Sequence, residues 1–148
     1  MTTPDFRHMT EALYRVVSAP PGRRDWDAVR HYYHPEARLV RTGLNPDGSS
    51  FALVMSLDAY IGNVEELLKE IRFSEVELAH EAVVFGNVAR LTSVYEYTRQ
   101  SPTETKQGRG VNFFTLIRDQ GRWLIMSIVW DNERPGLSLP ETLMSALR

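Results

Sequence analysis

The chain has 148 residues, a length that fits one domain, and 43% of them are hydrophobic, which is enough for a buried core. The net charge of -2 gives no electrostatic reason to expect nucleic acid or an anionic membrane as a partner, and the absence of cysteine excludes disulfides, thiolate metal sites and a cysteine nucleophile. Residues 1–6 lack the apolar run of a signal peptide, and no stretch approaches a membrane span. We therefore expect one cytoplasmic domain over residues 1–148.

The chain opens with two helical patterns separated by helix breakers. Apolar residues recur at helical spacing over 8–18, and the Ala-Pro-Pro-Gly sequence at 19–22 ends that helix. A second helix is predicted over 25–34, with Asp25 as its cap and Pro35 as its end.

A short strand pair and a third helix follow. Residues 37–42 and 51–55 predict two short strands, joined by the turn-rich sequence at 43–50. Ser56 is a candidate cap for a helix over 57–70.

The pattern then changes to that of strands. Residues 73–85 and 88–99 flank Gly86 and Asn87, which predicts a hairpin with a two-residue turn. The next connection, over 100–108, is long and polar, and loops of this kind often lie at a binding mouth.

A second hairpin closes the strand-rich region. Residues 111–117 and 123–130 are rich in β-branched and aromatic side chains, and the polar sequence at 119–122 predicts the turn between them. Both strands are apolar on both faces, so we expect the chain's own helices to cover one face and a second copy of the chain the other. A capping-box sequence at 138–141 predicts a short C-terminal helix with an apolar stripe of Leu139, Leu143 and Leu147. Helices gathered on one face of an antiparallel sheet make an α+β fold.

The last strands carry a pattern of short motifs. These are Tyr-Glu at 95–96, Arg-Gly-Val-Asn at 109–112, Gly-Arg-Trp at 121–123 and Trp-Asp-x-Glu-Arg-Pro-Gly at 130–136. The pattern resembles the nuclear transport factor 2-like superfamily, and within it a bacterial branch of uncharacterised members, over residues 8–143. The resemblance implies a strongly curved antiparallel sheet that N-terminal helices close into a cone with an internal pocket. It also implies a homodimer through the outer face of the sheet.

Relatives with this fold include ketosteroid isomerase and polyketide cyclases, so acid–base catalysis is the first candidate chemistry. Ketosteroid isomerase uses a carboxylate base on the first strand, with a tyrosine and a protonated carboxylic acid as its oxyanion hole. Here the position that matches the base falls at or beside Arg41, and a cation cannot act as a base at neutral pH. The position that matches the tyrosine falls near Val16 or Val17, with Tyr14 on a different face. Steroid isomerase activity therefore does not carry over.

Two basic side chains have open alternatives. Arg41 could bind an anionic group, such as a carboxylate or an enolate, or could pair at the surface with Asp58 or Glu66. His80, the one histidine in a predicted long strand, could face the pocket as a general base or could be a hydrogen-bonded core residue.

The favoured set of site residues lies on the long strands. A carboxylate, an amide and an indole that converge in an apolar cone would fit a small organic ligand, and two close carboxylates would raise one pKa. The alternative is that the carboxylates form surface ion pairs with Arg90, Arg109 or Arg134. The set comprises Glu96, Asn112, Trp130 and Asp131, with Tyr60 as a further aromatic on the helix above.

A metal site is not expected. His31 and His34 stand three residues apart in the predicted second helix, but a metal needs at least three ligands and the sequence offers no further ligand set.

Two functional hypotheses follow. The first is a cofactor-independent isomerase, dehydratase or cyclase that transfers protons through Asp131, Glu96 or His80. Its small organic ligand would be bound by Tyr60, Asn112, Trp130 and Arg41. The second is a non-catalytic dimerisation or accessory module, which an interior filled by large apolar side chains would favour.

Overall fold

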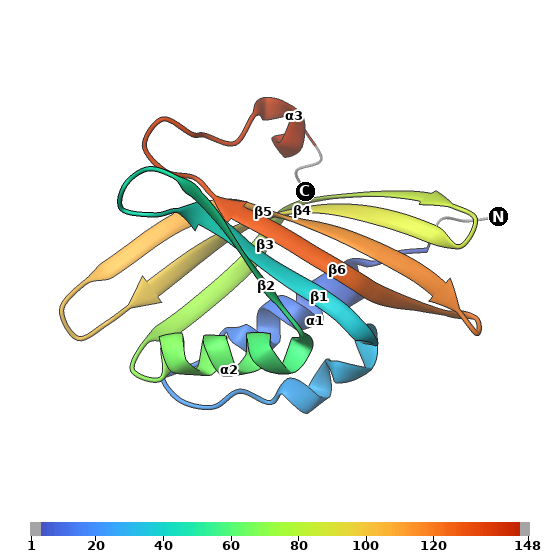
Figure 1. Cartoon of the computed structure of the whole chain (residues 1–148), viewed down its shortest axis with the longest axis horizontal. Helices are drawn as coiled ribbons and strands as arrows, with labels where there is room; N and C mark the ends of the chain where they lie inside the picture. The colour runs from blue at the N-terminus through green and yellow to red at the C-terminus, as the bar shows by residue number, and fades with distance from the viewer. Residues whose placement is uncertain (1–3, 146–148) are drawn as a thin grey trace.

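The computed structural model describes residues 4–145 as a mixed α+β structure (Figure 1). In chain order its elements are α1 (Arg7–Val17), the 3₁₀ turns η1 (Trp26–Ala28) and η2 (Arg30–Tyr32), β1 (Tyr33–Leu44), β2 (Ser50–Met55), α2 (Leu57–Leu68), β3 (Arg72–Phe85), β4 (Val88–Gln100), β5 (Thr105–Asp119), β6 (Arg122–Asn132) and α3 (Glu141–Met144). The strands form one six-stranded sheet in the order β2-β1-β6-β5-β4-β3. β1 runs parallel to β6, and the other neighbouring pairs are antiparallel. Within the described residues, no helix has both the length and the apolarity needed to cross a membrane.

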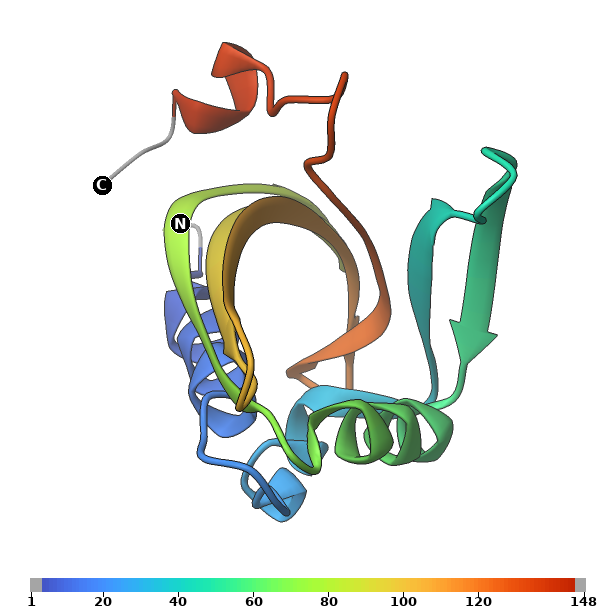
Figure 2. The same cartoon turned by 90° about the vertical axis from the view of Figure 1, so that its left-hand side faces the viewer.

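The sheet is strongly curved and open, and it has a concave and a convex face (Figure 2). α1 packs against β3, α2 lies beside β1, and the main core fills the space between these helical segments and the concave face. The most deeply buried members of that core are Phe6, Met9, Leu39, Leu91, Phe114, Leu116 and Ile125. α3 lies over the convex face, where a smaller cluster joins it to β3, β4 and β5.

Local turn chemistry forms both long hairpins where the sequence predicts them. The β3–β4 turn contains Gly86 with φ 59°, and the β5–β6 turn contains Gln120 and Gly121 with φ 53° and 78°. Positive φ in two-residue turns matches the right-handed twist of the flanking strands. The predicted third helix is also confirmed, because the Ser56 side chain accepts a hydrogen bond from Ala59 N and caps α2.

The predicted second helix over 25–34 is wrong. Two 3₁₀ turns replace it, and β1 already begins at Tyr33. Asp25 makes no side-chain capping hydrogen bond, and Tyr33 pairs with Ile125 of β6. Pairing with β6 thus outweighs the local helical pattern, and the register shift that follows Tyr33 accommodates Pro35, which has no N–H to donate.

One predicted connection in the second half of the chain is shorter than expected. The polar connection expected over 100–108 shortens to 101–104, because the β4–β5 ladder continues to the pair Gln100 and Thr105. The connection between these two strands is therefore four residues long.

The C-terminal helix forms without the expected capping box. α3 begins after Pro140 and has no side-chain cap. The Leu139 N–H instead donates to the Glu133 carboxylate at 2.7 Å. Leu139 and Leu143 pack on the convex face as part of the expected stripe, and Leu147 lies outside the described residues.

Two β-bulges decide which side chains reach the concave face. Leu78 is the extra residue of β3 relative to β4, and Met126 is the extra residue of β6 relative to β5. Side chains alternate between faces at a period of two, so a bulge restarts the alternation. The bulge at Leu78 therefore puts Glu77 and His80 on the same face, although they stand three positions apart in the sequence.

Candidate functional site

A cavity of about 450 Å³ lies between the concave face of the sheet and the helices α1 and α2. Its volume is in the range that holds a small organic molecule. Every strand from β1 to β6 except β2 contributes to its wall, and the wall is rich in aromatic rings. The aromatic lining residues are Tyr14, Tyr33, Tyr60, Phe73, Tyr95, Tyr97, Phe114 and Trp130.

Glycines in β5 make room for two of these rings. Tyr95 and Tyr97 of β4 stand directly opposite Gly110 and Gly108 of β5. A Cβ atom at either glycine would overlap the facing phenol. The two tyrosines can therefore lie across β5 on the concave side, which a larger residue at these positions would prevent. The Tyr95 hydroxyl continues across the sheet and donates to the Asn132 side-chain oxygen at 2.5 Å.

Glu75 of β3 brings a carboxyl group into this aromatic wall. Within residues 4–145 the carboxyl group has no hydrogen bond and no ion pair with another side chain. Burial raises the pKa of Glu75 to about 8, because the charged form loses its hydration without gaining a partner. Glu75 is therefore mostly a neutral acid at pH 7.

The backbone of Glu75 is held by the end of α1. Its N–H donates to the Ser18 hydroxyl at 2.8 Å. That hydroxyl in turn lies 2.7 Å from the carbonyl oxygen of Tyr14, to which it donates. One serine thus joins the last turn of α1 to the strand position that carries the carboxyl group.

A chain of hydrogen bonds runs from the cavity into the core through Tyr14. Asn112 Nδ2 donates to the Tyr14 hydroxyl at 2.9 Å, and that hydroxyl lies 2.6 Å from the Ser93 hydroxyl. Ser93 donates to Glu77 Oε2 at 2.5 Å, and His80 Nδ1 lies 3.0 Å from the same oxygen. Four strand residues and one helix residue thus form a continuous polar path.

The charge of Glu77 sets the direction of this chain. Burial alone would raise the pKa of Glu77, but hydrogen bonds from His80 and Ser93 outweigh it and hold the pKa below its ordinary value. An ionised carboxylate can only accept, so Ser93 must donate to it and must accept from Tyr14. The Tyr14 proton consequently points towards Ser93, and its oxygen offers only lone pairs to the cavity.

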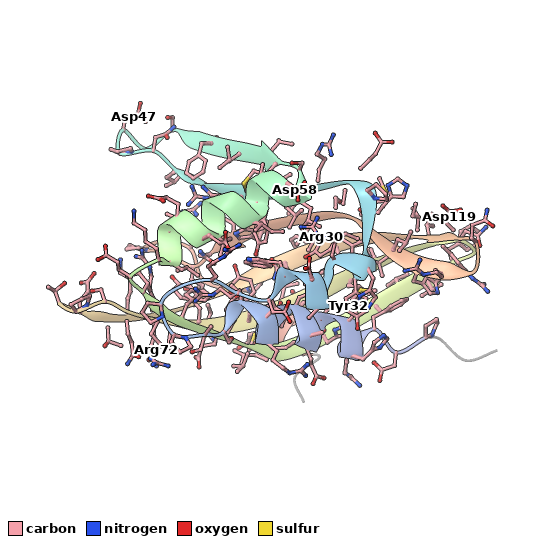
Figure 3. All side chains as sticks on the ribbon, turned by 90° about the horizontal axis from the view of Figure 1, so that it is seen from below. Arg30, Tyr32, Asp47, Asp58, Arg72 and Asp119 are labelled. Carbon is pink, nitrogen blue, oxygen red and sulfur yellow. The ribbon has the colours of Figure 1, made fainter. Side chains whose placement is uncertain are left out.

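Arg41 of β1 lines the cavity, and no acidic side chain of residues 4–145 forms an ion pair with it. Both carboxylates that could have paired with it are bound elsewhere. Asp58 lies 3.0 Å from Arg30 (Figure 3), and Glu66 lies 3.0 Å from Lys69. The Arg41 Nε atom is buried and has no hydrogen-bond partner in residues 4–145.

Three other predicted ligand-binding residues also line the cavity. Asn112, Trp130 and Tyr60 come from β5, β6 and α2. The rings of Tyr60 and Trp130 meet edge to face with centroids 5.8 Å apart, and Trp26 packs on the far side of Tyr60 at 5.7 Å. The Tyr60 hydroxyl has no hydrogen-bond partner among the described residues, which leaves it open to a ligand.

The two predicted catalytic carboxylates do not join this set, and the expected convergence must be corrected. Glu96 is exposed on the convex face, because it alternates with the inward-facing Tyr95 and Tyr97. Asp131 alternates in the same way with Trp130 and forms a 2.8 Å ion pair with Arg134. The strand phase thus separates both carboxylates from Asn112.

His80 is buried on the concave face but is not part of the cavity wall. Its pairing with Glu77 makes it the inner end of the Tyr14 hydrogen-bond chain. The helical spacing expected of His31 and His34 is lost, since His31 packs against the Tyr32 ring in a tilted arrangement and His34 accepts a hydrogen bond from Glu36 N. No cluster of three His, Asp or Glu side chains able to hold a metal occurs in residues 4–145.

Comparison with known proteins identifies the fold. No protein-family model and no curated protein matches the sequence. A solved NTF-2-like protein of unknown function from Silicibacter pomeroyi aligns with a TM-score of 0.54 and 19% identity, over 86% of this chain and 92% of that one. This chain has the nuclear transport factor 2-like fold. The resemblance read from the sequence is therefore confirmed at the level of fold.

Two further structures show how varied this fold is. A protein from Shewanella frigidimarina, provisionally assigned as a ketosteroid isomerase, aligns with a TM-score of 0.59 and 15% identity, over 84% of this chain and 92% of that one. The association domain of CaMKII from C. elegans aligns with a TM-score of 0.60 and 13% identity, over 86% of this chain and 92% of that one. Identities this low show the nuclear transport factor 2-like fold and leave the activity open.

The sequence analysis missed two residues of the candidate site, Glu75 and Tyr14. Tyr14 faces the cavity, contrary to the expectation that it lies on another face of the helix. A signal for Glu75 was available. Glu75 shares its strand phase with Phe73 and Glu77, so two carboxyl groups lie on one face of a strand whose neighbouring residues are largely apolar.

Proposed function

We propose that the protein binds a small organic molecule in the cavity and transfers protons on it, as an isomerase, dehydratase or cyclase that needs no metal or redox cofactor. In this proposal the curved sheet and its concave-side helices form a cone, and the cavity inside it is the ligand pocket. The observation that carries the proposal is the unpaired carboxyl group of Glu75 in the cavity wall, with a pKa raised by burial to about 8. Perturbed titratable groups in a cavity are characteristic of catalytic sites.

The pKa of Glu75 suits work in both directions near neutral pH. A general acid or base is most effective when its pKa lies close to the working pH. The acid form can donate its proton to a carbonyl oxygen, and the carboxylate form can remove a proton from the carbon beside that carbonyl. An isomerisation returns this proton to another carbon, so Glu75 ends in its starting state and no electrons are gained or lost.

Neighbouring groups would position the substrate. The Asn112 amide uses one N–H for Tyr14, which leaves its second N–H and its oxygen for a ligand. The Tyr60 hydroxyl and the Trp130 ring supply a polar and an apolar wall, and Arg41 supplies a cation. Glu75 takes the catalytic role that the sequence pattern gave to Asp131, Glu96 and His80, because those three lie outside the cavity wall.

The test is proton exchange on a flat bicyclic ketone, 2-tetralone, which is small enough for a cavity of about 450 Å³. In D₂O the ¹H NMR signal of its C1 protons decays as they exchange. We expect the protein to accelerate this decay, with a rate that rises from pH 6 to pH 8 as the Glu75 carboxylate forms. Glu75→Gln should lower the catalysed rate to that of buffer.

Glu96→Gln is the matched control, because it removes an exposed carboxylate from the convex face of the adjacent strand. This variant should exchange like the unmodified protein. A Glu75→Gln variant that retains the catalysed exchange would overturn the assignment.

A second candidate function, a dimerisation or accessory module, is favoured by the convex face. An apolar row crosses four neighbouring strands there at one register level. It consists of Val54, Val40, Val129 and Phe113, of which Val54, Val129 and Phe113 are substantially exposed. Exposed apolar patches of this kind mark interaction surfaces, and the fold's occurrence in an association domain supports the same candidate. A homodimer through this face is compatible with the catalytic proposal.

A further inference from the structure

The charge of the cavity differs in sign from that of the whole chain. The chain carries a net charge of -2 at neutral pH. The charged side chains of the cavity wall are the cations Arg41, Arg99 and Lys106, together with Glu75, which is mainly uncharged at pH 7. Arg99 and Lys106 are cross-strand partners of β4 and β5. A positive cavity in a negative protein favours an anionic ligand.

Arg41 is the cation best placed to bind the anion itself. Its Nε atom is buried without a hydrogen-bond partner, and no carboxylate of residues 4–145 pairs with it. A buried guanidinium donor that lacks a partner is costly, and a ligand carboxylate would satisfy it. Asp58 and Glu66, the two acids that the sequence suggested as partners of Arg41, form ion pairs with Arg30 and Lys69 instead.

An aromatic ring supports the Arg41 side chain. The Phe51 ring lies 5.7 Å from the Arg41 guanidinium carbon and covers it on one side. Phe51 reaches this place by lying across Gly43, where a Cβ atom would come within 2.8 Å of the ring. Gly43 and Arg41 occupy the same face of β1, so the glycine opens the path by which the ring supports the cation.

The rest of the wall fits a flat apolar body. Arg41 is the register partner of Trp130, whose ring meets Tyr60 edge to face. On the far side, the rings of Phe73 and Tyr97 stack with centroids 6.0 Å apart. Aromatic rings of a ligand would pack between these pairs.

Arg41 and Glu75 lie on opposite walls of the cavity. Arg41 belongs to β1 and Glu75 to β3, which are separated by β6, β5 and β4 in the strand order. The curvature of the sheet places these strands on the two sides of the concave space (Figure 2). A ligand held at one wall can therefore present its other end to the second.

We propose that the ligand is an organic monoanion with a flat, ring-containing body, whose carboxylate is bound by Arg41 while an oxygen at its far end reaches Glu75. This inference rests on the proposed function and adds the chemical class of its substrate. The bound carboxylate would occupy the Arg41 donors, and the Arg99 and Lys106 pair would draw the anion towards the cavity.

A matched pair of probes tests the inference. The probes are 2-naphthoate and 2-naphthamide, which share one ring system and nearly one shape but differ in charge. We expect the unmodified protein to bind 2-naphthoate at least about ten-fold more tightly in calorimetric titrations at pH 7. Arg41→Met should abolish this preference while leaving the 2-naphthamide affinity within about two-fold. Retained 2-naphthamide binding also shows that the variant is folded.

Arg38→Met is the control on the same strand, because the Arg38 side chain is exposed and bonds to the carbonyl oxygens of Glu36 and Ala37. It should keep the full preference for 2-naphthoate. Equal binding of both probes by the unmodified protein, or a preference that survives in Arg41→Met, would overturn the anion site. The proposed function would still stand in either case if Glu75-dependent exchange of 2-tetralone persists. Failure of both probes to bind would count against both proposals.

Discussion

At the scale of single residues, β3 carries two carboxyl groups on one face, and within residues 4–145 the Glu75 carboxyl has no partner while that of Glu77 is hydrogen-bonded. Glu75 and Glu77 share a face of β3, yet burial raises the pKa of Glu75 to about 8, while hydrogen bonds from His80 and Ser93 keep the pKa of Glu77 low. The two pKa values differ because Glu77 has hydrogen-bond donors beside it and Glu75 has none among the described residues, although the two residues are only two positions apart. The neutral acid is therefore available for proton transfer, and the charged one orients Tyr14 through Ser93.

The raised pKa of Glu75 predicts a specific dependence of stability on pH. Between pH 4.5 and 8 the unfolded chain releases the Glu75 proton, whereas the folded protein retains it. The folded state then binds more protons, so the free energy of unfolding falls as pH rises, by up to about 1.4 kcal/mol per pH unit. Below this window the effect is absent, and above it the loss is complete.

Urea denaturation of the unmodified protein and Glu75→Gln across pH 4 to 9 measures this effect as a difference. The variant has no proton to lose at residue 75, and Glu77 titrates in both proteins and cancels. We expect the difference between the two free energies of unfolding to shift in favour of the variant through the window. Curves that stay parallel would show that Glu75 has an ordinary pKa.

At the scale of elements, β4 and β5 shape the cavity through a matched pattern of tyrosine and glycine. Gly108 and Gly110 stand opposite Tyr97 and Tyr95, and each phenol occupies the space that a side chain at the facing glycine would fill. A glycine in a strand normally weakens it, so its presence at two alternate positions indicates a packing requirement.

Two glycine substitutions should have opposite effects on stability. A Cβ atom at Gly110 would overlap the Tyr95 hydroxyl, the Asn132 side chain and the backbone oxygen of Asp131. We expect Gly110→Ala to lower the free energy of unfolding by about 1–3 kcal/mol. Gly62 of α2 has open space around it, and Gly62→Ala should raise this free energy by about 0.5–1 kcal/mol. Chemical denaturation checks both, and a neutral Gly110→Ala would contradict the packing account.

The elements that the sequence predicted correctly are those determined by local chemistry. The hairpin turns at Gly86 and Gly121 and the cap at Ser56 depend on residues within a few positions of one another. The 3₁₀ turns that replace the second helix depend on β1 pairing with β6, a contact between residues about ninety positions apart, as in the Tyr33 and Ile125 pair. A pattern of neighbouring residues cannot predict such a distant contact.

The site was harder to predict because it depends on strand phase. Asn112 and Trp130 were assigned to the cavity wall together with Glu96 and Asp131. Glu96 directly follows the inward-facing Tyr95, and Asp131 directly follows the inward-facing Trp130, so both carboxylates point to the opposite face. The bulge at Leu78 changes the phase within β3 and has no sequence signal of its own. Fold and hairpins could therefore be read from the sequence, and the membership of the site only in part.

At the scale of the whole molecule, the two faces of the curved sheet carry different features. The concave face, covered by α1 and α2, holds the cavity, and the convex face carries α3 and the apolar row that ends at Phe113 (Figure 2). The proposed homodimer would bury that row without obstructing the cavity.

The proposed dimer predicts a sharp effect of one charge. Phe113 is 48% exposed at one end of the apolar row, and Phe113→Glu would place a carboxylate in the interface. We expect sedimentation velocity to show a dimer for the unmodified protein and a monomer for this variant, with unchanged circular dichroism. Phe85→Glu, at the tip of the β3–β4 hairpin, is the control and should remain a dimer. A monomeric unmodified protein would rule out the proposed interface.

Glu75 should be a largely neutral acid in the cavity wall at physiological pH, and a direct titration tests this. Carboxyl carbons of ¹³C-labelled glutamate can be followed by NMR from pH 4 to 10, with the Glu75 resonance assigned from its loss in Glu75→Gln. We expect a midpoint near pH 8 for this resonance. A midpoint near the ordinary value of 4.5 would contradict the account, because Glu75 would then be a solvated carboxylate with no acid to offer a substrate.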